Sequence, residues 1–128
     1  MDKAIGLILA LASPLLLWPV ESIIPLPAII EELYKGVISW KLRQEKIGWT
    51  IIAGIVLATS ETVFYLVNFL ALGNFENLPK RLLVTTVLHT STMVISGMGA
   101  RSNKFGWTIS LLISMAVHSL FNLFVGYF

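Results

Sequence analysis

Five apolar segments follow one another along the chain, each close to the length that crosses a membrane. They cover residues 4–20, 22–42, 48–72, 78–99 and 105–127. Because a transmembrane helix needs about 20 mostly apolar residues, each segment is predicted to be a membrane helix. Pro14 interrupts the first segment, whereas Pro25 and Pro27 fall at the start of the second, where a helix tolerates proline. The pattern predicts an all-α integral membrane protein, a compact bundle of about five transmembrane helices.

The connections between these segments are short, which makes successive helices antiparallel neighbours. No linker and no repeat of fixed period divides the 128 residues, so we expect a single transmembrane domain, residues 1–128. Within it, residues 1–20 are predicted to form an extra N-terminal span and residues 22–128 a four-helix core. The first segment lacks a small-residue cleavage site, and we interpret it as a retained span rather than a signal peptide.

Composition excludes several classes of protein. Hydrophobic residues make up 56% of the chain and charged residues 12%, whereas a soluble domain has about 25% charged residues. A formal net charge of +2 is no phosphate-binding footprint, so nucleic acid is not an expected partner. The chain has no cysteine, which excludes disulfides and thiolate chemistry. We therefore expect the lipid bilayer to surround the protein.

The basic residues outside the segments are distributed unevenly between the two sides of the predicted membrane. One side has Lys3, Lys41, Arg43, Lys46, Arg101 and Lys104. The other side has Lys80 and Arg81, beside Glu21. Because cytoplasmic loops carry the excess of Lys and Arg, the N-terminus is predicted to be cytoplasmic and the C-terminus to lie outside.

Ionisable residues inside the segments are the informative exception, because a charge in hydrocarbon is costly and usually functional. They are Glu31, Glu32, Lys35, Glu61, His89 and His118. At 1.5 Å per residue, the carboxylates and imidazoles all lie about 14–16 Å from the outer ends of their helices. Four helices therefore bring carboxylates and imidazoles to a common level. We expect these side chains to converge on one polar cavity.

The helical spacing of the polar residues agrees with a shared interior. Glu61 and Tyr65 are four residues apart, as are His118 and Asn122, so each pair lies on one helix face. Such faces must turn inward, because lipid cannot solvate them. Tyr65 and Asn122 are equally consistent with helix–helix hydrogen bonding and with catalysis.

The second segment contains adjacent acids, Glu31 and Glu32, which point about 100° apart on a helix. One of them is expected to act in the site and the other to orient it. Glu31 and Lys35 are predicted to pair at i, i+4, and Lys35 is as consistent with a structural role as with a functional one. Trp18 falls near a span end, a position typical of interfacial aromatic belts.

A cavity of carboxylates and imidazoles supports three kinds of chemistry. It can activate water for hydrolysis, hold a metal through nitrogen and oxygen ligands, or relay protons across the membrane. The H-E-x-x-H signature of soluble metalloproteases is absent, and no serine lies in a nucleophile elbow.

Four short motifs resemble those of the PrsW family of intramembrane proteases. E-E-L-Y-K at residues 31–35 resembles the family's E-E-x-x-K, and residues 54–65 resemble its second motif, with a glycine followed by a glutamate and an aromatic residue. Residues 89–101 are similar to its third helix, and H-S-L-F-N at residues 118–122 to its H-x-x-x-N ending. The related type II CAAX prenyl endopeptidases and Abi proteins have E-E-x-x-x-R and a histidine in the second motif. Lys35 and Glu61 at these places favour the PrsW branch.

The resemblance implies an intramembrane endopeptidase of a prokaryotic cell membrane, with a membrane protein or peptide as substrate. PrsW-like proteins usually have more spans, so this chain resembles the catalytic core plus one helix. The wider group has been viewed both as metalloproteases and as metal-free glutamate proteases. The candidate catalytic residues are Glu31, Glu32, Glu61, His89, His118 and Asn122.

Two mechanisms stay open for these residues. In both, Glu31 or Glu32 activates the water and Asn122 donates to the substrate carbonyl. Glu61, His89 and His118 either bind one Zn²⁺ or another divalent metal, or support the base and stabilise the oxyanion without one. Two rival functions use the same residues: a small proton-coupled transporter or channel subunit, and a non-catalytic scaffold of the same fold.

Overall fold

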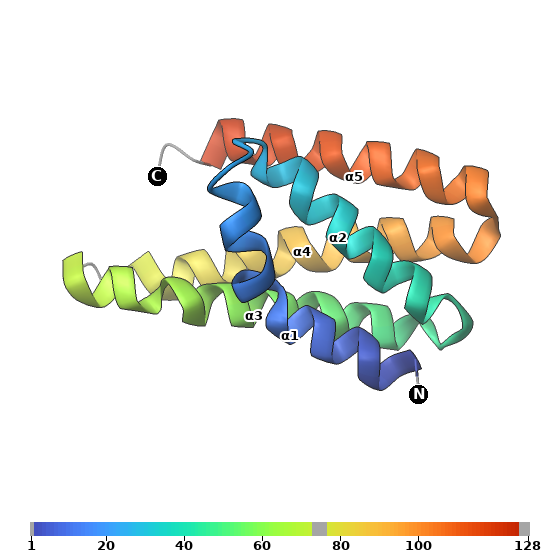
Figure 1. Cartoon of the computed structure of the whole chain (residues 1–128), viewed down its shortest axis with the longest axis horizontal. Helices are drawn as coiled ribbons and strands as arrows, with labels where there is room; N and C mark the ends of the chain where they lie inside the picture. The colour runs from blue at the N-terminus through green and yellow to red at the C-terminus, as the bar shows by residue number, and fades with distance from the viewer. Residues whose placement is uncertain (1, 73–76, 126–128) are drawn as a thin grey trace.

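The computed structural model describes residues 2–72 and 77–125, and over these residues the chain forms an all-α bundle of five helices (Figure 1). The fold class predicted from hydropathy is confirmed. A 3-10 turn, η1 (Leu42–Gln44), connects the second helix to the third. The helices are α1 (Asp2–Glu21), α2 (Pro27–Lys41), α3 (Ile47–Leu72), α4 (Asn77–Ser102) and α5 (Lys104–Val125).

Four of the described helices, α1, α3, α4 and α5, are long and apolar enough to cross a membrane, which marks the chain as an integral membrane protein. The predicted second span, residues 22–42, is wrong at its start. α2 has 15 residues and begins only at Pro27. Leu26 has φ −132° and ψ 56°, because a residue before proline is driven out of the helical region. At 1.5 Å per residue α2 is about 22 Å long, shorter than the hydrocarbon core.

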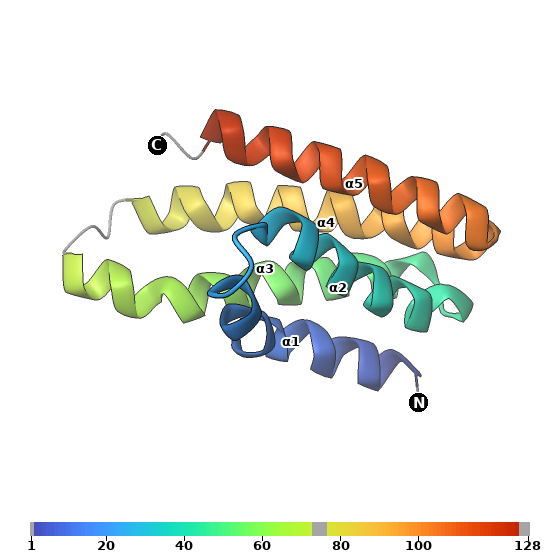
Figure 2. The ribbon, with the colours of Figure 1, turned by 45° about the horizontal axis from the view of Figure 1, so that its top comes forward.

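Helix α1 bends in its middle, so that its first half follows α3 and its second half turns across the bundle toward α2 (Figures 1 and 2). Pro14 lies inside α1 and lacks the N–H that would bond the carbonyl of Ala10. Two hydroxyls donate to that carbonyl instead, Ser13 Oγ at 2.8 Å and Ser60 Oγ of α3 at 3.2 Å. The bend is therefore stabilised by α3 itself.

Helices α3 and α4 approach each other closely along their lengths. A Cβ on Gly54 would lie 2.7 Å from the Cα of Thr90, which is backbone and has no room to move aside. Small residues at such positions let membrane helices come together, where packing drives association. Gly54 thus sets the distance between the helices that carry Glu61 and His89.

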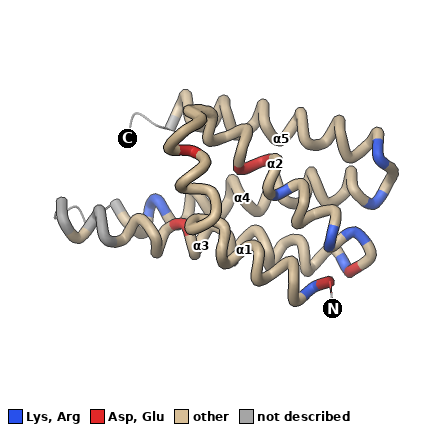
Figure 3. Tube along the Cα trace, viewed as in Figure 1, with Lys and Arg blue, Asp and Glu red and all other residues tan. Residues whose placement is uncertain are grey.

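Lys and Arg residues gather at one end of the bundle, around the start of α1, the η1 turn and the connection from α4 to α5 (Figure 3). Arg101 of α4 holds this end together. Its guanidinium donates to the carbonyls of Leu42 and Glu45 at 3.2 and 3.0 Å and to Thr50 Oγ1 at 3.1 Å. The acids of α2 and α3 lie away from this basic end, deeper in the bundle (Figure 3).

The close approach at Gly54 predicts a position-specific effect of adding one methyl group. Gly54→Ala should push α3 from α4 and lower stability by about 1–3 kcal/mol, the usual cost of overpacking. Gly48→Ala is the matched control, because nothing lies within 4 Å of its Cβ position. Thermal unfolding in detergent, followed by circular dichroism, compares the two. Equal melting temperatures for both variants would contradict the close approach.

Candidate functional site

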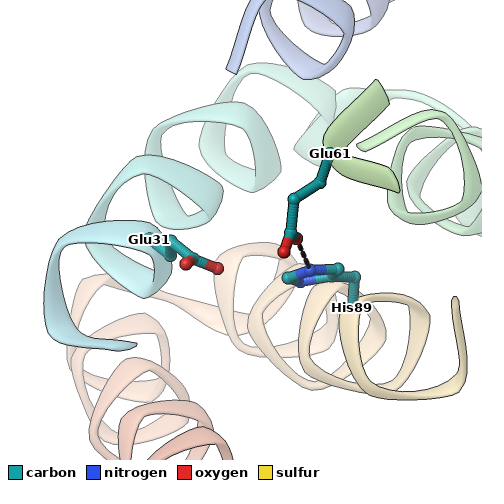
Figure 4. Close-up of side chains that lie close together, drawn as sticks. All are labelled: Glu31, Glu61 and His89. Atoms are coloured by element: carbon teal, nitrogen blue, oxygen red, sulfur yellow. Dashed lines mark hydrogen bonds and ion pairs between the residues drawn. The ribbon is translucent and has the colours of Figure 1, made fainter. Parts of the chain in front are cut away.

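Three side chains from three helices meet near the middle of the bundle (Figure 4). Glu61 of α3 and His89 of α4 form a short hydrogen bond, with 2.5 Å between Glu61 Oε2 and His89 Nε2. Glu31 of α2 points toward this pair, and one ligand atom from each residue lies within 4.8 Å of the other two. His89 is 1% exposed. The structure thus joins two predicted acids and one predicted histidine into a single group.

A second buried group lies beside the first and centres on Glu32. Glu32 Oε1 accepts hydrogen bonds from Lys35 Nζ at 2.5 Å and from His118 Nδ1 at 2.7 Å. Lys35 Nζ also donates to Thr92 Oγ1 of α4 at 3.1 Å. The predicted pairing of Lys35 with Glu31 is wrong: the partner is Glu32, at i, i+3. Glu32 and Lys35 are fully buried, so this pair lies on the inner face of α2.

His118 connects the two groups. Its Nδ1 is bound to Glu32, while its Nε2 lies 3.8 Å from Glu31 Oε2. The rings of His118 and His89 are edge to face, with centroids 5.7 Å apart. All the acids and imidazoles expected to share one level are therefore neighbours in space.

Asn122 does not lie in this interior. It follows His118 by one turn of α5, and its side chain is exposed. Among the hydrogen bonds of the described residues, none joins Asn122 to the buried groups. Its predicted role at a substrate carbonyl stays a prediction.

An open cavity borders the Glu31–Glu61–His89 group, with about 390 Å³ of empty space when the open space at its mouth is included. Glu31 and Glu61 form part of its wall. The other walls could not be predicted from the sequence, because an apolar N-terminal helix is expected to face lipid. The lining residues include Leu17, Trp18 and Glu21 from α1, and Leu57, Phe64 and Tyr65 from α3.

The place of Trp18 in an interfacial aromatic belt stays a prediction, and in the structure its side chain also lines the cavity. The first helix, predicted as an extra span, thus also contributes side chains to the cavity wall. One sequence feature accompanies the position of Trp18 in the cavity wall: Pro14 precedes it by one turn in an apolar helix.

Arg81 of α4 also contacts the Glu31–Glu61–His89 group, through Glu61. Its Nη2 lies 3.5 Å from Glu61 Oε1, and its guanidinium carbon lies 4.8 Å from the centre of the Tyr65 ring. Glu61 therefore uses one oxygen for His89 and the other for Arg81. Glu31 is held more loosely: its Oε2 is buried without a hydrogen bond to a described residue and lies 3.8 Å from His118 Nε2. His89 Nδ1 is likewise buried without a hydrogen-bond partner among the described residues.

These residues fit a divalent cation by the chemistry of their donor atoms. Two carboxylates and one imidazole are ligands that Zn²⁺ accepts, and three protein ligands leave a fourth position for water. Glu31 Oε2 and His89 Nδ1 are buried and form no hydrogen bond with a described residue, so both atoms have bonding capacity to spare. The residues that the structure brings together as candidate metal ligands are Glu31, Glu61 and His89. The metal ligands predicted from the sequence are Glu61, His89 and His118.

No protein-family model, curated protein or solved structure matches the chain. The interpretation of the site therefore depends on its own geometry and on the motifs in the sequence.

The hydrogen bonds of Glu32 predict that replacing this residue lowers stability strongly and that a second substitution at Lys35 restores most of it. Glu32→Met leaves the Lys35 ammonium buried without its carboxylate, and breaking one partner of a buried pair costs about 3–5 kcal/mol. The double variant Glu32→Met/Lys35→Met should recover most of that loss. Glu31→Met is the matched control on the adjacent residue and should cost less. Thermal unfolding in detergent measures all three; a single Glu32→Met as stable as the wild type would contradict the assignment.

Proposed function

We propose that the chain is an intramembrane endopeptidase, a hydrolase that cleaves a peptide bond of a membrane-protein substrate. The observation that carries the proposal is the group of Glu31, Glu61 and His89 at the wall of an open cavity inside a membrane bundle. A carboxylate hydrogen-bonded to an imidazole, with a second carboxylate beside it, is a suitable arrangement for removing a proton from water. Three of the four sequence motifs contribute these residues, and the fourth contributes the neighbouring His118.

Glu31 is the proposed general base. It lies in the cavity wall, and its Oε2 forms no hydrogen bond with any described residue, with His118 Nε2 3.8 Å away. Glu32 is less suited to this role, because it is fully buried and its Oε1 already accepts two hydrogen bonds. Glu61 holds His89 in place, and Glu32 holds His118 so that Nε2 faces Glu31. In this proposal His118, when protonated, donates to the developing oxyanion.

Glu31, Glu61 and His89 are also the residues that would hold a divalent cation. When bound, such a cation lowers the pKa of a bound water to near 7 and polarises the substrate carbonyl. Glu32 and His118 would then orient the neighbouring acid and imidazole from outside the ligand set, as outer hydrogen bonds do in metal sites. The same geometry serves the metal-free glutamate mechanism, so both alternatives stay within the proposal.

A proton relay is the second candidate, favoured by the contiguity of the polar contacts. Arg81, Glu61 and His89 connect through the neighbouring ring of His118 to Glu32 and Lys35. Proton-conducting proteins use chains of Asp, Glu and His within the membrane. A relay needs titratable side chains but no water attack on a substrate, and this difference separates the two functions.

The hydrolase proposal predicts that removing one charge abolishes cleavage. Glu61→Gln and Glu31→Gln should each lower the cleavage rate of a transmembrane peptide by about 10²–10⁴-fold, the contribution of a general acid–base group. Lys35→Met should have a smaller effect, because Lys35 supports Glu32 and does not reach the cavity wall. The rates come from mass spectrometry of peptide products in detergent or nanodiscs, with folding checked by circular dichroism.

Metal analysis of the same samples separates the two mechanisms. About one divalent cation per wild-type chain, lost in Glu61→Gln, identifies the metal-dependent form, whereas equal metal content identifies the metal-free form. If Glu61→Gln retains full hydrolysis of the membrane peptide, the catalytic assignment is wrong. The proton relay then becomes the better account.

We further propose that the basic end of the bundle and the N-terminus face the cytoplasm of a prokaryotic cell. The chain has no cysteine, so single cysteines report sidedness without background. Lys46→Cys and Lys104→Cys should resist a membrane-impermeant maleimide in intact cells and react after lysis. Lys80→Cys, toward the other end, should react in intact cells. The reverse pattern would refute this orientation.

A further inference from the structure

We propose that the cavity between α1 and α3 binds the side chain of a lysine or arginine in the membrane-embedded segment of the substrate, with Glu21 as the residue that selects it. This inference rests on the proposed function, because it places the selected side chain beside the bond to be cleaved. It gives the bent N-terminal helix a role in substrate choice.

The charge of the cavity carries the first step. Among the described residues that line it, Glu21, Glu31 and Glu61 carry carboxylates, and no lining residue carries a basic side chain. In the proposed mechanism Glu31 and Glu61 are used by the reaction. Glu21 has no part in that group, and its carboxylate stays available at the wall.

Glu21 also lacks a partner where one is needed. Its Oε1 is buried and forms no hydrogen bond with any described residue. A buried acceptor without a donor costs free energy that a ligand recovers by supplying the donor. An ammonium or guanidinium supplies it together with the opposite charge.

The remaining wall suits the rest of such a side chain. Leu17, Trp18 and Phe64 provide apolar surface, along which the methylene groups of lysine or arginine can lie while the charged end reaches an acid. Arg81 already shows that this wall accepts a guanidinium, because it stacks over Tyr65 and approaches Glu61. An apolar wall that also carries the Glu21 carboxylate thus complements a cationic side chain better than a neutral one.

Binding of tryptophan-free peptides tests the inference. The probes are leucine-rich transmembrane peptides with one arginine, methionine or glutamate at the midpoint, in detergent micelles. Binding is followed by tryptophan emission, and the part of the signal that is absent in Trp18→Phe reports the cavity. Wild-type protein should bind the arginine peptide at least about tenfold more tightly than the methionine peptide, or about 1.4 kcal/mol.

Variants at Glu21 assign the preference to this residue. Glu21→Gln should remove most of the preference for arginine, and Glu21→Lys should favour the glutamate peptide. Glu45→Gln, the same change at the basic end of the bundle, should leave the preference intact. Equal binding of the arginine and methionine peptides to wild type, or a preference that survives Glu21→Gln, overturns the inference.

Product analysis with the same peptides distinguishes this inference from the proposed function. Cleavage of all three peptides without preference overturns the role of Glu21 and supports the hydrolase. Arginine-selective binding through Glu21 without cleavage of any peptide supports the cation site and counts against the hydrolase.

Discussion

The Glu32 carboxylate is the interaction on which the interior of this bundle depends. Hydrocarbon supplies no water to an ionised side chain, so a buried charge must be satisfied by the protein itself. One oxygen of Glu32 accepts from Lys35 on its own helix and from His118 on α5, and Lys35 reaches Thr92 on α4. Three helices are thereby tied to one carboxylate, which fixes the rotation of the short helix α2.

That rotation decides what Glu31 can do. Adjacent residues on a helix point about 100° apart, so with Glu32 held in the core, Glu31 turns toward the cavity. The close approach of α3 and α4 at Gly54 brings Glu61 against His89 on the far side. The cavity-facing group is therefore a consequence of two constraints, the hydrogen bonds of Glu32 and the close approach of α3 and α4 at Gly54.

Hydropathy predicted the last three helices to within a few residues, and the shared depth of the ionisable residues predicted their convergence, because both follow from the solvent properties of the bilayer. The partner of Lys35 could not be predicted, since residues at i−3 and i−4 lie on the same helix face and only packing against α4 and α5 chooses between them. The start of α2 could have been predicted from Pro25 and Pro27, which restrict the residues before them. The place of Trp18 could not, because an apolar helix facing lipid and one lining a cavity have the same composition.

The cavity beside the acids depends on the bend of α1. A straight first helix would continue along α3; instead Pro14 releases the carbonyl of Ala10, and a membrane interior penalises any carbonyl left without a donor. Ser60 of α3 supplies a donor one residue before Glu61, so the bend is anchored at the site itself. The second half of α1 then crosses the bundle and adds Trp18 and Glu21 to a wall that α2 and α3 would otherwise leave to lipid. A single proline thus makes an apolar span one side of a cavity, and Ser60, which donates to the freed carbonyl of Ala10, holds that side next to the acids.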